Sequence, residues 1–174
     1  MTRVASFYNC VKSKPIPNFE GWFAREDGFI SNPYKQTIRG SMNKDGYCCY
    51  IDPGGGQHYI HRLVAKALVH NPNPTLFTEV DHKNGLRHDN RASNLRWANR
   101  TIQNLNRSFR GWKYYPRSKK YSAQCIVCGV KYKIGSSYKT AAEAHKAYVD
   151  FKNMKIEELY ALYLKDEDES ESTD

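Results

Sequence analysis

Residues 80 to 97 read VDHKNGLRHDNRASNLRW, and this stretch decides the fold that we expect around it. The sequence predicts a short strand over residues 79–83, a polar loop up to residue 93 and a second strand over residues 94–97. A helix follows from near Asn99, where Asn99 or Thr101 can cap the first turn and Ile102 and Leu105 supply an apolar side. The predicted order is therefore strand, loop, strand, helix.

The composition favours several small modules over one large core. A chain of 174 residues suits one ordinary domain or two to three small ones, and its long polar stretches argue against a single large core. No apolar run approaches the roughly 18 residues of a membrane span, and the start MTRVASFYNC lacks the long apolar centre of a signal peptide. We therefore expect a soluble, intracellular protein.

The charge points to a polyanionic partner. Lys and Arg number 27 against 18 Asp and Glu, which gives a net charge of +9. The last nine residues, DEDESESTD, hold six of the acids, so the rest of the chain carries +15. With 13% aromatic residues as well, the commonest partner for such a chain is nucleic acid. A membrane surface would require an amphipathic basic helix, and none is obvious.

The five cysteines predict neither disulfides nor a complete metal site. Their number is odd and the chain shows no secretion signal, so disulfides are not expected. Cys125 and Cys128 form a C-x-x-C that could be half of a zinc site, but no second C-x-x-C follows, and a four-ligand site needs two more ligands. The stretch SAQCIVCGVKYKIG has the pattern of a hairpin, so we favour small, half-buried strand residues over zinc binding.

A small antiparallel module is predicted upstream of the central stretch. Between residues 19 and 59, the short β-like runs GWFA, GFIS and GYCCYI alternate with turn signals rich in Gly, Asp, Asn and Pro. The next segment, HYIHRLVAKALVH, places Ile60, Leu63, Val64 and Leu68 at helical spacing and ends before two prolines. It predicts a short amphipathic helix.

A second folding unit is predicted downstream of Gly111. The run WKYYPRSKKYSAQCIVCGVKYKIGSSY offers three strands, with turns at residues 117–119 and 128–129. Thr140 then caps a helix over AAEAHKAYVDFKNM, with Glu143 as the acid of a capping box. A further helix, KIEELYALYLK, precedes the acidic tail, which has too little apolar content to fold.

The Asp-His pair of the central stretch suits the hydrolysis of a phosphodiester. That reaction needs an activated water, a cation on the developing charge, and groups that hold both in line. Asp81 and His82 can supply a cation ligand and a base, although neighbouring strand residues point to opposite faces unless the strand twists or ends in a bulge. Asn94 could accept the Nδ1 proton of His82 and leave Nε2 as the base. Gln103 or Asn104 could add an amide oxygen beside Asp81 on a hard cation such as Mg²⁺.

The surrounding motifs resemble a known family. The pattern D-H-x-x-G (81–85) followed by D-N-x-x-x-N-L-R-W (89–97), and preceded by H-R-L-V-A (61–65), is similar to the HNH homing endonucleases of phages, which are built on a ββα-metal motif. Upstream, PIPNFEGWFAREDGFISN resembles the N-terminal module that often precedes such a nuclease. Downstream, residues 111–151 resemble the APETALA-type DNA-binding domain of plant ethylene-response factors.

The resemblance implies an α+β fold in four parts. These are an N-terminal antiparallel β module at residues 1–58 and a ββα-metal HNH nuclease at 59–108, then a three-stranded antiparallel sheet packed on one helix at 109–153. A short helix and a disordered acidic tail complete the chain at 154–174.

The resemblance also implies a site-specific DNA endonuclease of homing type. It makes His82 the general base, Asp81 a metal ligand and Asn94 the residue that orients His82. The remaining ligand falls on Gln103, where the family usually has Asn or His, with Asn104 as the alternative one residue on. The implied cofactor is Mg²⁺, or another divalent cation such as Mn²⁺.

The implied substrate is double-stranded DNA rather than a small molecule. One site per chain predicts nicking by a monomer, in the cytoplasm of a bacterial host cell. The alternative is a sequence-specific DNA-binding protein whose nuclease site has decayed, which the unusual Gln103 suggests.

Basic side chains around the motif and in the second sheet are the candidate DNA contacts, because contacts to backbone phosphates dominate DNA affinity. Trp22 and Trp97 are expected in the core, and His61 is expected to pack or hydrogen-bond against the hairpin rather than to bind a metal. The candidate contacts are Arg87, Arg91, Arg96, Arg100, Arg107, Arg110, Trp112, Lys113, Arg117, Lys119, Lys120, Lys131 and Lys133.

Overall fold

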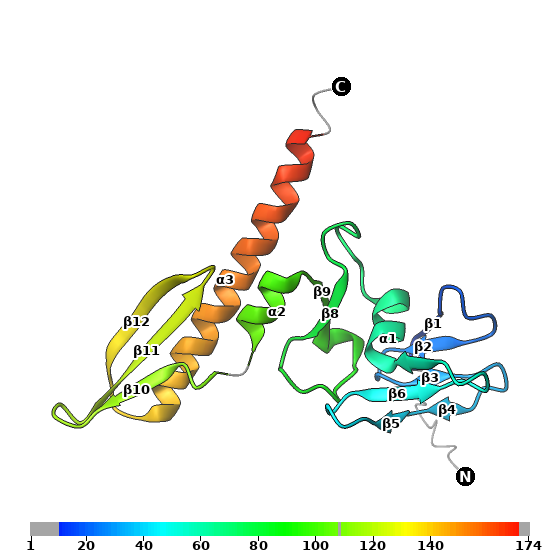
Figure 1. Cartoon of the computed structure of the whole chain (residues 1–174), viewed down its shortest axis with the longest axis horizontal. Helices are drawn as coiled ribbons and strands as arrows, with labels where there is room; N and C mark the ends of the chain where they lie inside the picture. Colours follow the sequence, from blue (N-terminus) through cyan, green and yellow to red (C-terminus); the bar gives the residue numbers. More distant parts are fainter. Residues whose placement is uncertain (1–10, 108, 171–174) are drawn as a thin grey trace, which may run out of the picture. The chain divides into compact units, whose positions relative to one another are not determined.

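The computed structural model describes residues 11–107 and 109–170. The chain forms two compact units, the first made of Met1–Asn71 with Val80–Trp97 and the second of Pro72–Glu79 with Ala98–Asp174. Figure 1 shows their helices and strands, coloured along the sequence.

Two small antiparallel sheets open the first unit, as the alternation of β-like runs and turns predicts. The turns are tight enough to require glycine in places, for example at Gly46, where φ is 85°. The strands of the first sheet, in spatial order, are β1 (Ser13–Pro15), β2 (Phe23–Arg25), β3 (Ile30–Ser31) and β4 (Thr37–Ile38), and those of the second are β5 (Ser41–Met42), β6 (Cys48–Ile51) and β7 (Gln57–Tyr59).

The predicted amphipathic helix is α1 (Ile60–Leu68), and it builds the core of the first unit. Ile60, Leu63 and Val64 are buried at helical spacing, as expected, and they contact apolar residues of β2 and β3. Val80 and Leu95, from the two strands of the central stretch, complete the same cluster. The core of this unit therefore fixes where that hairpin lies.

The central stretch forms the predicted hairpin. Strand β8 (Glu79–His82) pairs with β9 (Leu95–Ala98), and a 3-10 turn, η1 (Ala92–Asn94), leads into β9. The backbone N–H of Lys83 donates to the carbonyl of Asn94 at 2.8 Å, which closes the loop between the strands.

The second unit begins its main segment with α2 (Arg100–Asn106). Of the two predicted caps, Asn99 is the one used, since its side-chain oxygen accepts from the backbone N–H of Ile102 at 3.0 Å. The inserted residues 72–79 also belong to this unit, where the fully buried ring of Phe77 lies 4.9 Å from that of Tyr160.

The predicted three-stranded sheet of the second unit is confirmed. It has the order β10 (Trp112–Tyr115), β11 (Lys120–Val127) and β12 (Val130–Tyr138), all antiparallel, and lies against helix α3 (Ala141–Ser170). Its two turns fall where expected, with φ of 53° at Lys119 and 49° at Cys128. The sheet and its helix thus form one folding unit.

Helix α3 corrects the prediction for the last part of the chain. We expected two helices and an unfolded acidic tail, whereas one helix runs from Ala141 to Ser170. No Gly or Pro interrupts this segment, which is rich in Ala, Glu, Lys and Leu, so nothing in the backbone ends the helix at the expected gap. Thr140 caps the helix as predicted, since its Oγ1 accepts from the N–H of Glu143 at 3.1 Å; the Glu143 carboxylate accepts from the N–H of Lys139 at 2.9 Å rather than from that of Thr140 as in a regular capping box. Residues 171–174 of the expected tail lie outside the described residues.

The fold is α+β, as predicted. In the part of the chain that the structure describes, no helix is both long and apolar enough to cross a membrane.

Candidate active site

His82 is the last residue of β8 and lies inside the first unit. Burial alternates along this strand, so that Val80 and His82 are buried while Asp81 between them is half-buried. His82 is only 4% exposed. A polar ring so deeply buried needs hydrogen-bond partners, and these determine what it can do chemically.

The partner of the His82 ring corrects our prediction. His82 Nε2 lies 3.2 Å from the side-chain oxygen of Asn90, a buried residue of the loop, whereas we expected Asn94 to contact Nδ1. Because an amide oxygen only accepts, Nε2 carries the hydrogen in this contact. The neutral ring then keeps its lone pair on Nδ1, so Nδ1 rather than Nε2 is the candidate base.

Asn94 hydrogen-bonds to residues of the loop rather than to His82. Its side-chain nitrogen donates to the carbonyl of Asp89 at 2.8 Å and to Asn84 Oδ1 at 3.0 Å, and its oxygen accepts from the N–H of Asn84 at 3.1 Å. Turn η1 places Asn94 inside the loop, where these backbone groups would otherwise be unsatisfied. Asn94 therefore supports His82 indirectly, by shaping the loop that carries Asn90.

Burial also sets the charge state of the site. Desolvation lowers the pKa of His82 below its usual 6.5, although the hydrogen bond that Nε2 donates to Asn90 Oδ1 acts to raise it. The ring is thus neutral at physiological pH, the form in which an imidazole can act as a base. Beside it, the Arg91 guanidinium lowers the pKa of Asp89 to about 2, and Asp89 stays an anion.

Asp81, the predicted metal ligand, is paired with a cation of the chain. Arg96 Nε and Nη2 donate to Asp81 Oδ2 at 2.9 and 2.7 Å, and both side chains are nearly buried, at 12% and 13% exposed. This fork binds Arg96 across the hairpin, and the DNA contact that we predicted for Arg96 stays a prediction. A cation at Asp81 has to share this carboxylate with Arg96.

The other predicted ligands lie on α2. Gln103 is half-buried and Asn104 is exposed there, and both belong to the second unit. Their relation to Asp81 remains a prediction. Among the side chains that the structure describes, which end at residue 164 in α3, no three from His, Cys, Asp or Glu come together as a metal cluster. The zinc alternative receives no support either, since Cys125 is buried in β11 while Cys128 is exposed in a turn.

A turn of the first sheet supports the loop, and sequence reasoning did not connect the two. The carbonyl of Glu26 accepts from the N–H of Ala92 at 3.1 Å. Next to it, Gly28 has φ of 89°, and a Cβ there would meet the backbone of Asn90 and Arg91 at 2.6 Å. The Asp-Gly turn was visible in the sequence, but nothing local indicated that it touches the residue that binds His82.

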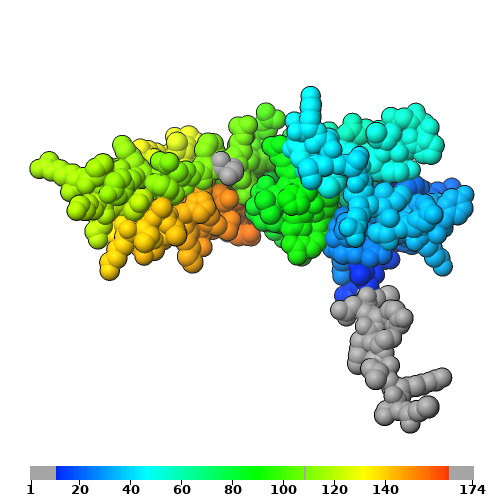
Figure 2. Space-filling view, turned by 90° about the horizontal axis from the view of Figure 1, so that it is seen from below, coloured from blue at the N-terminus to red at the C-terminus, as the bar shows by residue number. Residues whose placement is uncertain are grey.

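Aromatic rings surround His82 on the side of α1. His61 is buried in the first turn of α1, and its ring centroid is 5.0 Å from that of His82 and 5.1 Å from that of Tyr47. His61 therefore lies against the hairpin, as predicted. Arg87, at the outer edge, stacks 4.9 Å above the Tyr47 ring and donates to the carbonyl of Asp45 at 2.8 Å. Figure 2 shows the loop (green) against the segment around residues 40–50 (cyan).

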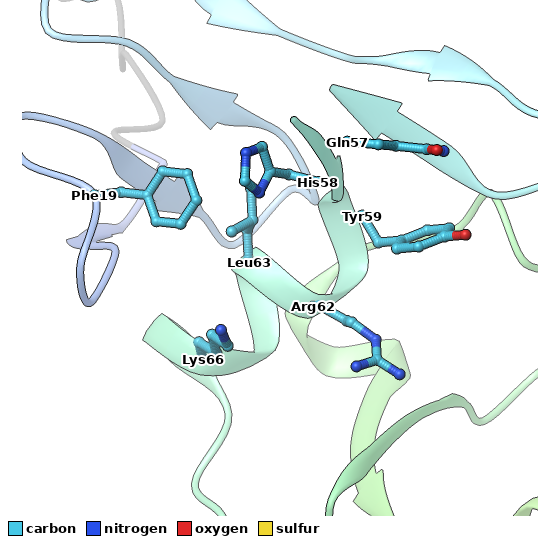
Figure 3. A pocket seen from close by; sticks show the side chains of 7 residues that line it. All are labelled: Phe19, Gln57, His58, Tyr59, Arg62, Leu63 and Lys66. Carbon is cyan, nitrogen blue, oxygen red and sulfur yellow. The ribbon is translucent and has the colours of Figure 1, made fainter. Parts of the chain in front are cut away.

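A pocket of about 420 Å³ opens beside α1 in the same unit (Figure 3). The Phe19 ring meets the edge of the His58 ring at 4.9 Å, and Leu63 lies below them. Arg62 and Lys66, one helical turn apart, are exposed and make no ion pair with the described residues. We did not single out these two cations, although their i, i+4 spacing on the polar side of α1 was readable.

The remaining predicted DNA contacts are surface side chains. In the first unit Arg91 is 63% exposed and paired with Asp89. In the second sheet, Lys131 and Lys133 pair across from Ile126 and Gln124, on the face opposite Tyr132, which packs on α3. Further exposed cations of the second unit are Arg100, Arg107, Arg110, Lys113, Arg117 and Lys119, while Trp112 and Lys120 are half-buried and Arg110 stacks 4.1 Å over Trp112.

Two curated proteins of Acanthamoeba polyphaga mimivirus are similar to this chain, and each is named an uncharacterized HNH endonuclease. One is 37% identical over 91 residues, which cover 50% of this chain and 23% of that protein. The other is 34% identical over 91 residues, which cover 51% of this chain and 27% of that protein. The chain thus spans about a quarter of the length of these relatives. No family model and no solved structure matches it.

Proposed function

We propose that this protein is a DNA endonuclease of the HNH type that uses His82 as its general base. The observation that carries the proposal is the buried His82 ring at the end of β8, held at Nε2 by the side-chain oxygen of Asn90. The names of the two similar viral proteins support the same activity. The net charge of +9 suits DNA as the substrate.

In the proposed reaction His82 Nδ1 removes a proton from a water molecule as its oxygen attacks the phosphorus. The P–O3′ bond breaks, and the leaving oxygen takes a proton from solvent water to become a 3′ hydroxyl, while the other product keeps a 5′ phosphate. Asn90 holds the ring in the required tautomer, and Asn94 holds the loop around it. The hairpin core of Val80 and Leu95 keeps these groups in place.

A divalent cation fits the donor set that we predicted. Carboxylate and amide oxygens are the ligands that Mg²⁺ prefers, and one or two protein ligands leave positions for water and phosphate. Asp81 would supply one such ligand, and Gln103 and Asn104 on α2 stay predicted ligands; Mn²⁺ could take the place of Mg²⁺. When bound, such a cation neutralises charge on the phosphate and on the leaving oxygen.

DNA binding is assigned to cations of both units. In the first unit Arg87, Arg91, Arg62 and Lys66 are exposed on the surface around the hairpin and α1. In the second unit we propose that the open face of the β10–β12 sheet contacts DNA as in the APETALA-type domains. Together these surfaces would give the site specificity of a homing nuclease. Because each chain has one catalytic site, we propose that a monomer nicks a single strand.

The Asp81–Arg96 pair favours one alternative, a DNA-binding protein that no longer cuts. An arginine fork on the expected metal ligand neutralises the charge that a cation would need. In this alternative the protein binds DNA through the same surfaces, and His82 has only a structural role as a buried side chain.

Plasmid cleavage separates the two functions. We expect wild type to nick supercoiled DNA with Mg²⁺ and not with EDTA, and His82→Ala to cut at least roughly 100-fold more slowly, the usual contribution of a general base. His88→Ala, an exposed histidine of the same loop, is the matched control and should cut normally. If wild type binds DNA but cuts with none of Mg²⁺, Mn²⁺, Co²⁺ or Ca²⁺, the nuclease proposal is wrong.

A further inference from the structure

His61 is a buried histidine that the proposed reaction does not use. It is 5% exposed, on the inner side of α1, with the rings of Tyr47, Tyr59 and His82 around it. Its Nδ1 is fully buried and, within the described residues, has no hydrogen-bond partner. A leucine or phenylalanine would fill this place without such an unsatisfied atom, so packing alone does not explain a histidine here.

The other ring nitrogen is the part of His61 that reaches the surface. Nε2 is not enclosed as Nδ1 is, and no described residue hydrogen-bonds to it, so the small exposed fraction of the residue leaves Nε2 open to solvent or to a ligand. Burial lowers the pKa of this imidazole to about 3, and the ring is therefore neutral. A buried N–H without a partner is costlier than a buried lone pair, so the single hydrogen of the ring lies on Nε2.

We propose that His61 is a second catalytic residue, whose Nε2–H donates a hydrogen bond to a non-bridging oxygen of the phosphate that His82 attacks through water. This inference rests on the nuclease function proposed above. The donor would stabilise the negative charge that grows on the phosphoryl oxygens during attack. It transfers no proton, and its ring stays neutral throughout.

The geometry places the donor at the right range. A water bound to His82 lies about 3 Å from the base nitrogen, and the phosphorus that it attacks lies about 3–3.5 Å further on. The centroid of the His61 ring is 5.0 Å from that of the His82 ring, and both residues are buried. This separation is short enough for one phosphate to meet both a water held by His82 and an N–H of His61. Arg62 and Lys66, which follow on α1, would hold the neighbouring backbone.

The test compares His61→Phe with wild type in nicking rate, DNA affinity and thermal unfolding. Phenylalanine keeps an aromatic ring in the stack but offers no donor. We expect a nicking rate at saturating DNA roughly 100-fold lower, as on removal of one oxyanion donor, with DNA affinity unchanged and the melting temperature unchanged or raised. His61→Gln keeps an N–H of similar reach and should recover part of the rate.

Each result decides the matter. If His61→Phe nicks at the wild-type rate, the role of His61 is overturned while the nuclease function stands. A loss of rate with matching losses of affinity and melting temperature assigns His61 to structure and also overturns it. If the variant does not fold, imidazole ¹⁵N spectra of wild type replace it: the His61 Nε2–H signal must shift when DNA is added with Ca²⁺, and an unchanged signal refutes the contact. If wild type itself never nicks, both proposals fail.

Discussion

Replacing His61 with Phe should make the first unit less sensitive to acid. In the folded protein the pKa of His61 lies at about 3, because burial disfavours the cation, whereas an unfolded chain has the usual 6.5. Between these two pKa values, His61 therefore binds a proton in the unfolded state and not in the folded state. Stability contributed by the neutral ring is complete above about pH 6.5, is lost as the pH falls below that value, and stops falling near pH 3.

The size of the effect follows from these two values. Between about pH 7.5 and pH 5, protonation of His61 in the unfolded chain should lower the free energy of unfolding by about 2 kcal/mol. Because pH 5 lies well above 3, this loss hardly depends on the folded-state value. In His61→Phe the loss should be absent, and at pH 7.5 the variant should be at least as stable as wild type, since the unsatisfied Nδ1 is gone.

Urea unfolding at the two pH values measures this difference. In a Trp112→Phe background, tryptophan fluorescence comes from Trp22 and Trp97, so it follows the first unit alone. All other ionisable groups are present in both proteins, so the difference in pH dependence reports the loss of the His61 imidazole. His70→Phe, which removes an exposed imidazole of the same unit, is the control and should keep the wild-type pH dependence. Equal losses in wild type and His61→Phe would refute the burial argument.

Three further predictions concern the support of the site. Gly28→Ala should destabilise the first unit and slow nicking, because the new Cβ meets the backbone of the loop at 2.6 Å, whereas Gly46→Ala, with similar φ and open space, should show only the smaller backbone cost of roughly 1 kcal/mol. Arg96→Met should lower the free energy of unfolding by roughly 2–4 kcal/mol, because it takes the guanidinium away from the nearly buried Asp81 carboxylate. It should also lower the Mg²⁺ concentration that gives half-maximal nicking. If the variant needs more Mg²⁺ than wild type, Asp81 is not a metal ligand. The nicking rate should be constant above neutral pH and fall on acidification with a midpoint below 6.5, because burial lowers the pKa of His82 and the cation cannot accept a proton; a midpoint above 6.5 would contradict this.

Local signals in the sequence predicted most of the elements. The spacing of Ile60, Leu63 and Val64 predicted α1, the Asn-rich loop between apolar ends predicted the β8–β9 hairpin, and Asn99 was one of two predicted caps of α2. These features depend on neighbours within a few residues, which is why periodicity and turn residues suffice to find them. The break expected in α3 was wrong because no breaker residue stands there in the sequence, and short strands such as β1 (Ser13–Pro15) were not predicted.

The contacts of the site were beyond the same reasoning. The loop holds Asn84, Asn90 and Asn94, three chemically equivalent amides, and spacing alone favoured the wrong one for His82. The choice depends on the path of the loop, which turn η1 and the distant turn at Gly28 set together. In the same way, the contact between Arg96 and Asp81 follows from the alternation and pairing of two strands.

By itself, then, the sequence determined the helices and strands, the excess of positive charge and the presence of an Asp-His pair in a hairpin. Only the tertiary structure decided that Asn90 binds His82, that Arg96 forms an ion pair with Asp81 and that the His61 ring lies against the His82 ring. The physical reason is range. Secondary structure arises from backbone preferences and apolar spacing over a few residues, whereas a hydrogen bond or a ring contact depends on which distant groups the core brings within a few ångströms.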